Sequence, residues 1–266
     1  MSGTLDRLIR ILSSFDAERP AMTVAALARR ADLPLPTAYR WVERLVGAEL
    51  LQKDDDGLVR PGLRLWEMAS RSAPSMSLAR TAMPFLVDVQ SVLRQNTQLA
   101  VLDDEGVLVL ERLSSQGAVV NQAAVAGRLP PFTTSLGLVL LAHSPADVAE
   151  RFIARHRRQL GVAVEHHPSE AGGAAPAGAR VRVTAPTEPH LRALLAGIRR
   201  EGYAAVDGAL DEEARGIAVP VTRADGTVVA ALGAVVPCEA PYTPGVPPLL
   251  MTAARGIARA VGGDSH

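Results

Sequence analysis

The sequence contains few of the features that mark secreted, disulfide-bonded or membrane-spanning proteins. Cys238 is the only cysteine among 266 residues, so no disulfide can form within one chain and a cytoplasmic location is expected. No run of about 18 uninterrupted apolar residues occurs, so we expect neither a transmembrane helix nor a membrane partner. Asp6, Arg7 and Arg10 interrupt the N-terminus, so no secretory signal is expected there.

Lysine and net charge are also low. Lys53 is the sole lysine, and 28 basic residues balance 28 acidic ones. Nucleic-acid-binding proteins are often basic, so such a function here has to depend on where individual arginines lie. Positive charge carried by arginine favours bidentate contacts to phosphate or guanine. A compositional bias, alongside abundant alanine, glycine and proline, explains the arginine excess as well.

The length and composition of the chain favour two domains. With 266 residues, of which 48% are hydrophobic, the chain can bury two cores. We expect a first domain over residues 1–70 and a second over 79–266. The segment 71–78 between them is rich in serine and contains Pro74, and we interpret it as a linker.

Residues 23–61 have the order of a winged helix-turn-helix: helix, tight turn, helix and β-hairpin. Thr23 can cap the first helix, and Asp32-Leu33-Pro34 ends it. The second helix is predicted over residues 36–47, because apolar side chains recur there at helical spacing. These side chains are Ala38, Trp41, Val42 and Leu45.

The opposite face of this second helix is polar. It carries Thr37, Arg40, Glu43 and Arg44, with Tyr39 on its flank. Hydroxyl, aromatic and guanidinium groups opposite a packing face suit the major groove of double-stranded DNA, so we expect DNA as a partner. The hairpin that follows turns at residues 54–57, where Asp54, Asp55 and Asp56 would repel phosphates. We therefore do not expect its tip to lie on the DNA backbone.

The second half of the sequence alternates between strand and helix patterns. Paired strands are predicted over 98–103 with 107–113 and over 216–222 with 227–236. Helices are predicted over 78–95, 135–142, 145–159, 191–202 and 248–261. The low-complexity stretch 161–189 predicts a loop. Strands joined by tight turns and flanked by helices indicate an α+β domain around an antiparallel sheet.

Ordered blocks of residues resemble the IclR-type bacterial transcriptional regulators, over nearly the whole chain. In the first half the blocks are Leu27-Ala28-Arg29-Arg30, Leu33-Pro34, Thr37-Ala38-Tyr39-Arg40 and Gly62-Leu63-Arg64-Leu65. In the second half they are Gly127-Arg128-Leu129-Pro130, Thr134-Ser135-Leu136-Gly137, Ile198-Arg199-Arg200-Glu201-Gly202-Tyr203 and Arg215-Gly216-Ile217-Ala218-Val219-Pro220-Val221. The resemblance implies a winged helix-turn-helix followed by a GAF-like domain that binds a small-molecule effector. It also implies homodimers or tetramers on palindromic operators.

By position, the resemblance assigns contacts to DNA. The candidate DNA-binding residues are Thr37, Tyr39, Arg40, Arg44, Lys53 and Arg60. Tyr39 and Arg40 would read bases, Thr37 would lie near a phosphate or base edge, and Arg44 would contact phosphate. The alternatives are a solvated helix face for both arginines, packing at the helix edge for Tyr39, and an ordinary helix start for Thr37.

The resemblance also implies an effector pocket against the sheet. Its candidate residues are Leu129, Phe132, Thr133, Ser135, Leu136, Asp207, Gly216, Gly233 and Val235. The family usually has cysteine at Gly216, small polar residues at Gly233 and Val235, and often lysine at Leu138. Because these departures remove polar groups or bulk, we expect a roomier, more apolar pocket and a larger or less charged effector, such as an aromatic compound. The alternative is that these residues pack against neighbours and the pocket lies elsewhere.

The leading interpretation is a ligand-responsive transcriptional regulator, a repressor released by a small, rather apolar effector. A winged helix fused to a small enzyme and a ligand-free DNA-binding protein are the alternatives. No Ser-His-Asp, metal-binding or phosphate-loop pattern occurs, so we expect no catalytic residue, metal or cofactor. His166-His167 and the glycine-rich 172–178 lie in the low-complexity stretch without the spacing that a metal or phosphate site requires.

Overall fold

The computed structural model describes residues 3–16, 19–72, 74–119, 123, 125–166, 181–239 and 243–263. The chain divides into two compact units, Met1–Met76 and Ser77–His266. In the described part of the chain, no helix combines the length and apolar character needed to cross a membrane.

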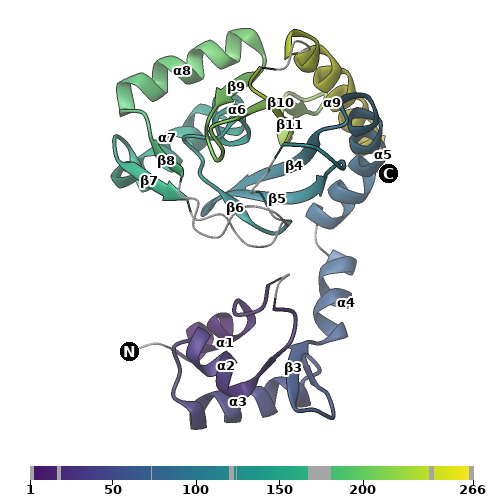
Figure 1. Ribbon diagram of the computed structural model, residues 1–266, viewed down its shortest axis with the longest axis vertical. Helices are drawn as coiled ribbons and strands as arrows, with labels where there is room; N and C mark the ends of the chain where they lie inside the picture. The colour runs from purple at the N-terminus through teal and green to yellow at the C-terminus, as the bar shows by residue number, and fades with distance from the viewer. Residues whose placement is uncertain are drawn as a thin grey trace. The chain divides into compact units, whose positions relative to one another are not determined.

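The N-terminal unit is a winged helix-turn-helix (Figure 1). Its elements are α1 (Thr4–Leu12), β1 (Met22–Thr23), α2 (Val24–Arg30), α3 (Leu35–Gly47), β2 (Leu51–Lys53), β3 (Leu58–Pro61) and α4 (Leu63–Ser72). The strands form an antiparallel sheet in the order β1-β3-β2. The sequence pattern missed β1, because a strand of two residues has no periodicity to detect.

Local chemistry explains where the helices of this unit begin and end. The Thr23 hydroxyl accepts a hydrogen bond from the backbone N–H of Ala26 at 3.2 Å, which caps α2 as predicted. Asp32 has a φ of 49°, which turns the chain between α2 and α3. Both helices then bury their apolar faces in one core, which includes Leu27, Trp41 and Leu45.

The C-terminal unit is built on a six-stranded antiparallel sheet in the order β6-β5-β4-β11-β10-β9. The strands are β4 (Asn96–Asp103), β5 (Gly106–Leu113), β6 (Arg128–Leu129), β9 (Ala204–Asp207), β10 (Ala214–Thr222) and β11 (Val228–Pro237). The helices are α5 (Pro74–Leu93), α6 (Ser135–His143), α7 (Ala146–Arg155), α8 (Glu188–Glu201) and α9 (Val246–Gly263), with 3-10 turns η1 (Arg157–Gln159) and η2 (Thr243–Gly245).

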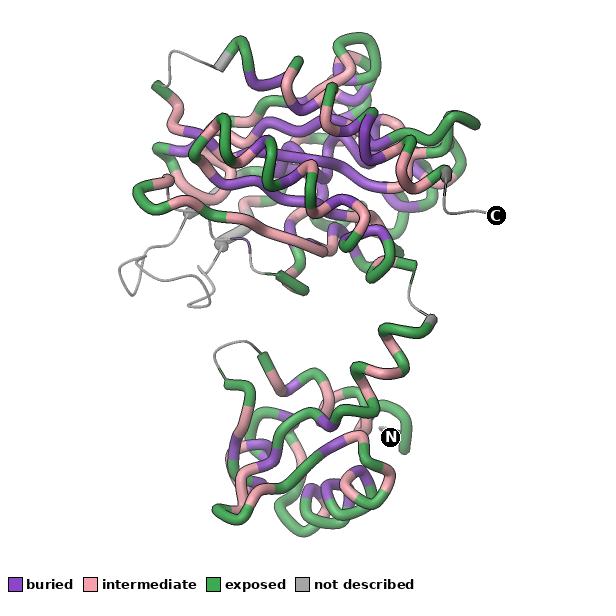
Figure 2. Tube along the Cα trace, turned by 90° about the vertical axis from the view of Figure 1, so that its right-hand side faces the viewer, coloured by how far each residue is buried: buried purple, intermediate pink, exposed green. Residues whose placement is uncertain are grey.

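Helices cover both faces of this sheet. Residues of α6, α7 and α8 form one apolar core with the sheet, and residues of α5 and α9 form a second core on the other face (Figure 1). Figure 2 shows buried residues running through the centre of this unit and exposed residues around it. Helix α6 is buried from Ser135 to Ala142. This layered α+β arrangement confirms the predicted fold class.

Gly137 brings the start of α6 unusually close to the preceding backbone. A Cβ at this position would lie 2.3 Å from the carbonyl oxygen of Pro131, so only glycine fits without displacing the chain. Thr134 caps the helix, since its hydroxyl accepts from the Gly137 N–H at 3.4 Å and donates to the Pro130 carbonyl at 2.7 Å. The start of α6 is therefore held in a defined place at the sheet.

The predicted linker 71–78 contains the division between the two compact units, after Met76, and it is largely helical, because α4 extends to Ser72 and α5 begins at Pro74. The expectation of a loop over 161–189 was wrong. The stretch 161–189 contains an antiparallel pair, β7 (Ala163–His166) and β8 (Val181–Thr184), while residues 167–180 lie outside the described residues. Strands β6 and β9 were missed as well, since both are short and lie at the sheet edges.

Candidate functional site

Helix α3 has one face in the core of the N-terminal unit and the other in solvent. Ala38 and Val42 have no exposed surface, and Leu45 is 2% exposed. On the opposite side Tyr39 is 46% exposed, and Arg40 is exposed too. In the part of the chain that the structure describes, neither Tyr39 nor Arg40 has a hydrogen-bond or ion-pair partner. Both side chains can therefore meet an external partner.

Arg44 and Thr37, the other candidates on α3, are more constrained. The guanidinium carbon of Arg44 lies 5.3 Å from the centre of the Trp41 ring, which favours a cation–π attraction. Thr37 is half-buried in the first turn, and its N–H bonds to the Pro34 carbonyl. A guanidinium held against its own helix is suited to a fixed contact such as a phosphate.

The hairpin formed by β2 and β3 carries the two remaining candidates. Lys53 Nζ lies 3.9 Å from Glu43 Oε1, so the lysine is partly neutralised, and Arg60 is exposed on β3. Asp54 Oδ1 accepts from the Leu58 N–H at 2.8 Å and closes the turn. One of the three aspartates at the tip thus has a structural role.

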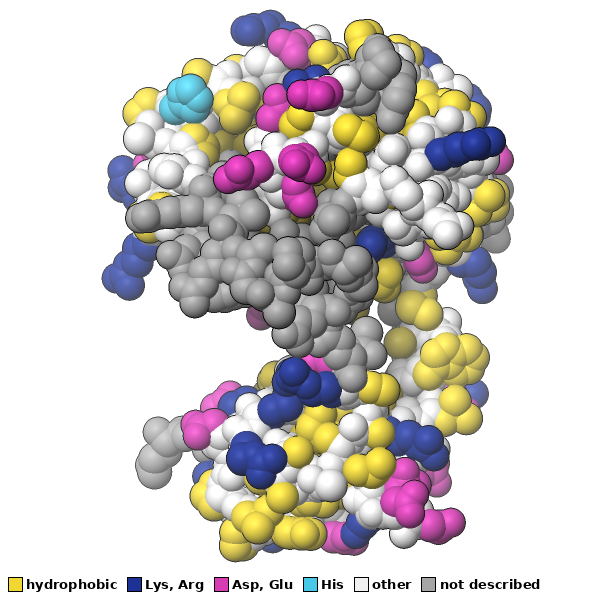
Figure 3. All heavy atoms as spheres, viewed as in Figure 1, with side chains coloured by type: hydrophobic (Ala, Val, Ile, Leu, Met, Phe, Trp, Pro, Cys, Tyr) yellow, Lys and Arg dark blue, Asp and Glu magenta, His cyan; other side chains and the backbone are white. Residues whose placement is uncertain are grey.

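Charge is mixed on the face of the N-terminal unit that Figure 3 shows, where basic, acidic and apolar side chains are interspersed. That face carries no continuous basic surface, so on it individual arginines have to provide any contacts with DNA.

The C-terminal unit contains a narrow pocket beside the first turn of α6. Its lining comes from β4, β6, β10, β11, α6 and the segment that follows β9. The lining residues are Gln98, Leu129, Thr134, Ser135, Leu136, Ala209, Leu210, Asp211, Ala214, Gly216 and Val235. The free volume inside it is about 40 Å³, well below the roughly 300–1,000 Å³ that is usual for ligand pockets.

The structure brings together only part of the predicted effector site. Five candidates line this pocket: Leu129, Ser135, Leu136, Gly216 and Val235. Phe132, Thr133 and Asp207 instead line a separate hollow between α8 and β9. Asp207 is also paired with Arg215, which holds the pKa of its carboxyl below the usual value. Gly233 is buried and lines neither the pocket beside α6 nor the hollow between α8 and β9.

The missing side chains at two glycines do not enlarge this pocket. A Cβ on Gly216 would lie 2.9 Å from Ser135 Oγ, and one on Gly233 would lie 3.0 Å from Leu136 Cδ2. Neighbouring side chains thus already fill the space that bulkier residues would take. Leu138 faces the core instead of the pocket. The expectation of a roomier pocket stays a prediction, and in this structure Ser135 and Leu136 occupy the space beside the two glycines.

Polar groups that the sequence did not single out also line the pocket. Gln98 is only 5% exposed, and its Oε1 has no hydrogen-bond partner among the described residues. Leaving such a group unsatisfied costs about 1–3 kcal/mol, so a missing partner is indicated. In the first turn of α6, the N–H groups of Ser135 and Leu136 have no intrahelical partner within the described residues and can bind an electron-rich oxygen. The one sequence signal for Gln98 was its polar side chain within the otherwise apolar pattern of β4.

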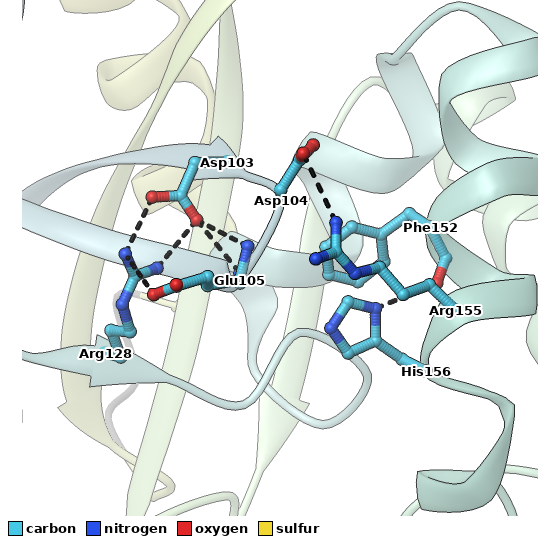
Figure 4. A network of polar contacts seen from close by, with 8 residues as sticks. Asp103, Asp104, Glu105, Arg128, Phe152, Arg155 and His156 are labelled. Atoms are coloured by element: carbon cyan, nitrogen blue, oxygen red, sulfur yellow. Dashed lines mark hydrogen bonds and ion pairs between the residues drawn. The ribbon is translucent and has the colours of Figure 1, made fainter. Parts of the chain in front are cut away.

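A network of charged residues holds Leu129 at the pocket. Arg128 binds both carboxylate oxygens of Asp103 at 2.7 Å and lies 3.3 Å from Glu105 (Figure 4). These bonds hold the pKa of Asp103 below its usual value. They also tie β6 to the turn between β4 and β5. On the same turn, Asp104 lies 3.3 Å from Arg155 of α7 (Figure 4).

Within the described residues, no group of three His, Cys, Asp or Glu side chains is placed to hold a metal ion. His167 and the glycine-rich 172–178, which the sequence analysis discounted as site residues, lie outside the described residues.

Family models match both units. The IclR helix-turn-helix domain matches residues 4–55. The C-terminal domain of the bacterial transcriptional regulator IclR matches residues 70–164.

Solved structures and characterised relatives point to the same family. An IclR homologue from Microbacterium hydrocarbonoxydans, complexed with 4-hydroxybenzoate, is 40% identical with a TM-score of 0.80, over 98% of this chain and 100% of that chain. Another, from Microbacterium sp. strain HM58-2, is 38% identical with a TM-score of 0.57, over 99% and 100%. The Pca regulon regulatory protein of Pseudomonas putida is 25% identical over 86% of this chain and 72% of that protein.

These families and relatives are transcriptional regulators and not enzymes. The chain therefore belongs to the IclR family of bacterial transcriptional regulators, with a DNA-binding helix-turn-helix in its N-terminal unit.

Proposed function

We propose that this protein is a cytoplasmic repressor that reads a palindromic operator as a homodimer or tetramer and is released by a small, rather apolar effector. The observation that carries the proposal is the free face of α3, where Tyr39 and Arg40 are exposed without partners in the described part of the chain. A guanidinium or phenol in that position can reach the edges of bases in a major groove.

The remaining contacts would position the protein on DNA without selecting its sequence. Arg44 is held over Trp41, and Lys53 and Arg60 lie on the strands of the wing. Arginine and lysine on phosphates add affinity that falls with salt. Thr37 at the start of α3 is placed to donate to a nearby phosphate or base edge.

The N-terminal unit also has apolar surface that fits a second copy of the chain. Leu5 and Ile9 on α1 are 67% and 51% exposed, and Leu63 and Trp66 on α4 are 62% and 61% exposed. Large exposed apolar side chains mark interaction surfaces. A dimer doubles the number of base pairs read, which one short recognition helix needs for useful selectivity.

The pocket beside α6 is the proposed effector site. Leu129, Leu136 and Val235 supply apolar contacts, and Gln98 and the first turn of α6 supply hydrogen bonds. The related protein that binds 4-hydroxybenzoate supports a compact aromatic effector. To fit, the effector has to displace Ser135 or Leu136 from the space beside the glycines, and this displacement is a candidate signal toward the DNA-binding unit.

Effector binding changes DNA affinity only if the effector binds the two states of the protein unequally. We propose that the effector favours the state with weaker operator affinity.

The first test is fluorescence anisotropy with the DNA immediately upstream of this protein's own gene, against a scrambled duplex at fixed salt. The proposal predicts that the upstream DNA binds at least about 1,000-fold more tightly. Equal affinity for both duplexes contradicts sequence-specific reading at that site.

A further inference from the structure

Within the described part of the chain, three buried polar atoms on one face of the sheet lack hydrogen-bond partners. They are Oδ1 of Asn96 and Oε1 of Gln98, both on β4, and Nε of Arg112 on β5. Asn96 has no exposed surface and Gln98 is 5% exposed. Residues two apart in a strand point to the same face, so Asn96 and Gln98 project together. Arg112 is directly opposite Gln98 in the antiparallel ladder, so it projects to that face as well.

This face is the one that carries the pocket. On the other side of β4, Gln98 is opposite Gly233 and Asn96 is opposite Val235. Gln98 and Val235 both line the pocket. The unpartnered polar atoms thus lie in and directly beside the pocket.

Among the described residues, no counter-ion accompanies the positive charge of Arg112. Its one hydrogen bond in the described part of the chain runs from Nη1 to the carbonyl of Ala123 at 2.9 Å, and no carboxylate there lies within ion-pair distance. The adjacent Glu111 is opposite Leu99, which belongs to the core on the other face. Burial lowers the pKa of Arg112, as expected for a cation that has lost water without gaining an anion.

Oδ1 of Asn96 and Oε1 of Gln98 could accept from Nε of Arg112, yet these three atoms remain unpaired among the described residues, whereas Nδ2 of Asn96 donates to the Val119 carbonyl at 2.7 Å. A guest that moves neighbouring side chains aside can supply the missing hydrogen bonds. A carboxylate matches Arg112, because the planar guanidinium binds its two oxygens and Nε2 of Gln98 can donate to it alongside, while a hydroxyl on the same guest can donate to Oε1 of Gln98.

We propose that Arg112 and Gln98 form an anion-binding subsite beside the pocket, and that a carboxylate of the effector is the missing partner of Arg112. The proposal rests on the pocket being the effector site and makes the effector a compact acid. The apolar body of the acid lies against Leu129, Leu136 and Val235, so it remains rather apolar apart from its one charge. Arg112 then decides between an acid and a neutral molecule of the same shape.

The test compares 4-hydroxybenzoate, benzoate and acetate with methyl 4-hydroxybenzoate, by calorimetry on the full chain. The wild-type protein is expected to prefer 4-hydroxybenzoate over its ester. Arg112→Met, which keeps much of the length but not the charge, is expected to weaken binding of the acid about tenfold to hundredfold and to change ester binding little. The control Arg80→Met removes an exposed arginine of α5, and its affinities are expected to match the wild type.

Two further variants keep the test decisive if Arg112→Met folds poorly. Arg112→Lys retains the positive charge but not the planar guanidinium that binds two oxygens at once, and it is expected to keep part of the preference for the acid. Gln98→Met removes the amide and is expected to reduce affinity for the acid. Equal losses for acid and ester indicate a structural role and overturn the proposal, as does a wild-type protein that binds none of the carboxylates.

Operator binding, measured without ligand on the same samples, separates this inference from the proposed function. Selective operator binding together with indifference to acids overturns only the anion subsite. Acid binding that depends on Arg112 in a protein without operator selectivity overturns only the repressor.

Discussion

The two units present their polar recognition groups in opposite ways. Tyr39 on α3 is 46% exposed, whereas Gln98 beside the pocket is 5% exposed. A solvated group binds a large charged partner with little desolvation, and salt screens much of the attraction. A buried, unpartnered group costs stability until a ligand satisfies it, but then discriminates strongly against ligands that lack the matching atom.

Because of this difference, the two units have to keep different parts of their structure rigid. For the proposed reading of DNA, the N-terminal unit needs a rigid α3 scaffold, since the candidate side chains Tyr39 and Arg40 reach outward. The C-terminal unit has to hold four sheet strands and the start of α6 in register, because the pocket forms where they meet. The predictions below test this comparison, from the largest expected effect to the smallest.

The largest effects are expected from two glycines, each of which closes a tight contact in its own unit. A Cβ on Gly62 would lie 2.1 Å from the Glu49 carbonyl oxygen, and one on Gly137 would lie 2.3 Å from that of Pro131. Because backbone atoms cannot move aside cheaply, each change to alanine is expected to destabilise its unit by about 3 kcal/mol. Urea unfolding, followed separately for each unit, measures this.

Matched controls exist on helices of the same two units. Gly47 and Gly197 have open space where a Cβ would be placed, so alanine there is expected to stabilise by up to about 1 kcal/mol. If Gly62→Ala lowers the stability of both units equally, the units are not independent and the comparison fails.

The next effect is on reading of the operator by Arg40. If Arg40 contacts a guanine, Arg40→Ala reduces the preference for operator over scrambled DNA by about 1–3 kcal/mol. Anisotropy titrations on both duplexes measure the preference, and Arg71→Ala, an exposed arginine on α4, serves as the control. An unchanged preference assigns Arg40 to a solvated helix face.

Arg44→Ala sharpens the contrast within α3. Since Arg44 is held against Trp41 and is expected on a phosphate, its loss weakens binding to all duplexes alike. The slope of log affinity against log salt is expected to fall by about 1, with sequence preference unchanged. A change in preference would instead make Arg44 a base reader.

The smallest effect is a pH dependence confined to the C-terminal unit. Burial, with the nearby Arg199, lowers the pKa of His143, although its Nδ1 lies 3.0 Å from the Val139 carbonyl. Below a pH of about 6.5, the unperturbed pKa of histidine, His143 binds a proton more readily in the unfolded chain than in the native state. The free energy of unfolding therefore falls as pH decreases. His143→Gln is expected to reduce the loss between about pH 7 and about pH 5.5.

The N-terminal unit provides the control, because all six histidines lie beyond residue 140. Urea midpoints for the two units at both pH values measure the effect. A loss of equal size in wild type and His143→Gln contradicts the assignment.

Local pattern predicted much of the N-terminal unit but less of the pocket. The periodicity of Ala38, Trp41, Val42 and Leu45 fixed both faces of α3, since each face depends only on neighbours in the same helix. The pocket depends on long-range register, which places Arg112 opposite Gln98 and Gly233 beside it. A strand sequence does not reveal its partners, so neither the anion subsite nor the side chains filling the glycine spaces could be predicted.

The central claim is that a ligand bound in the C-terminal unit changes how tightly the N-terminal unit holds its operator. The direct measurement is the operator Kd of the full chain, by anisotropy at fixed salt, with and without saturating 4-hydroxybenzoate. The account predicts that the ligand raises the Kd about 5- to 150-fold, with less change in the Arg112→Met variant. An identical Kd with the pocket filled, confirmed by calorimetry, would contradict it.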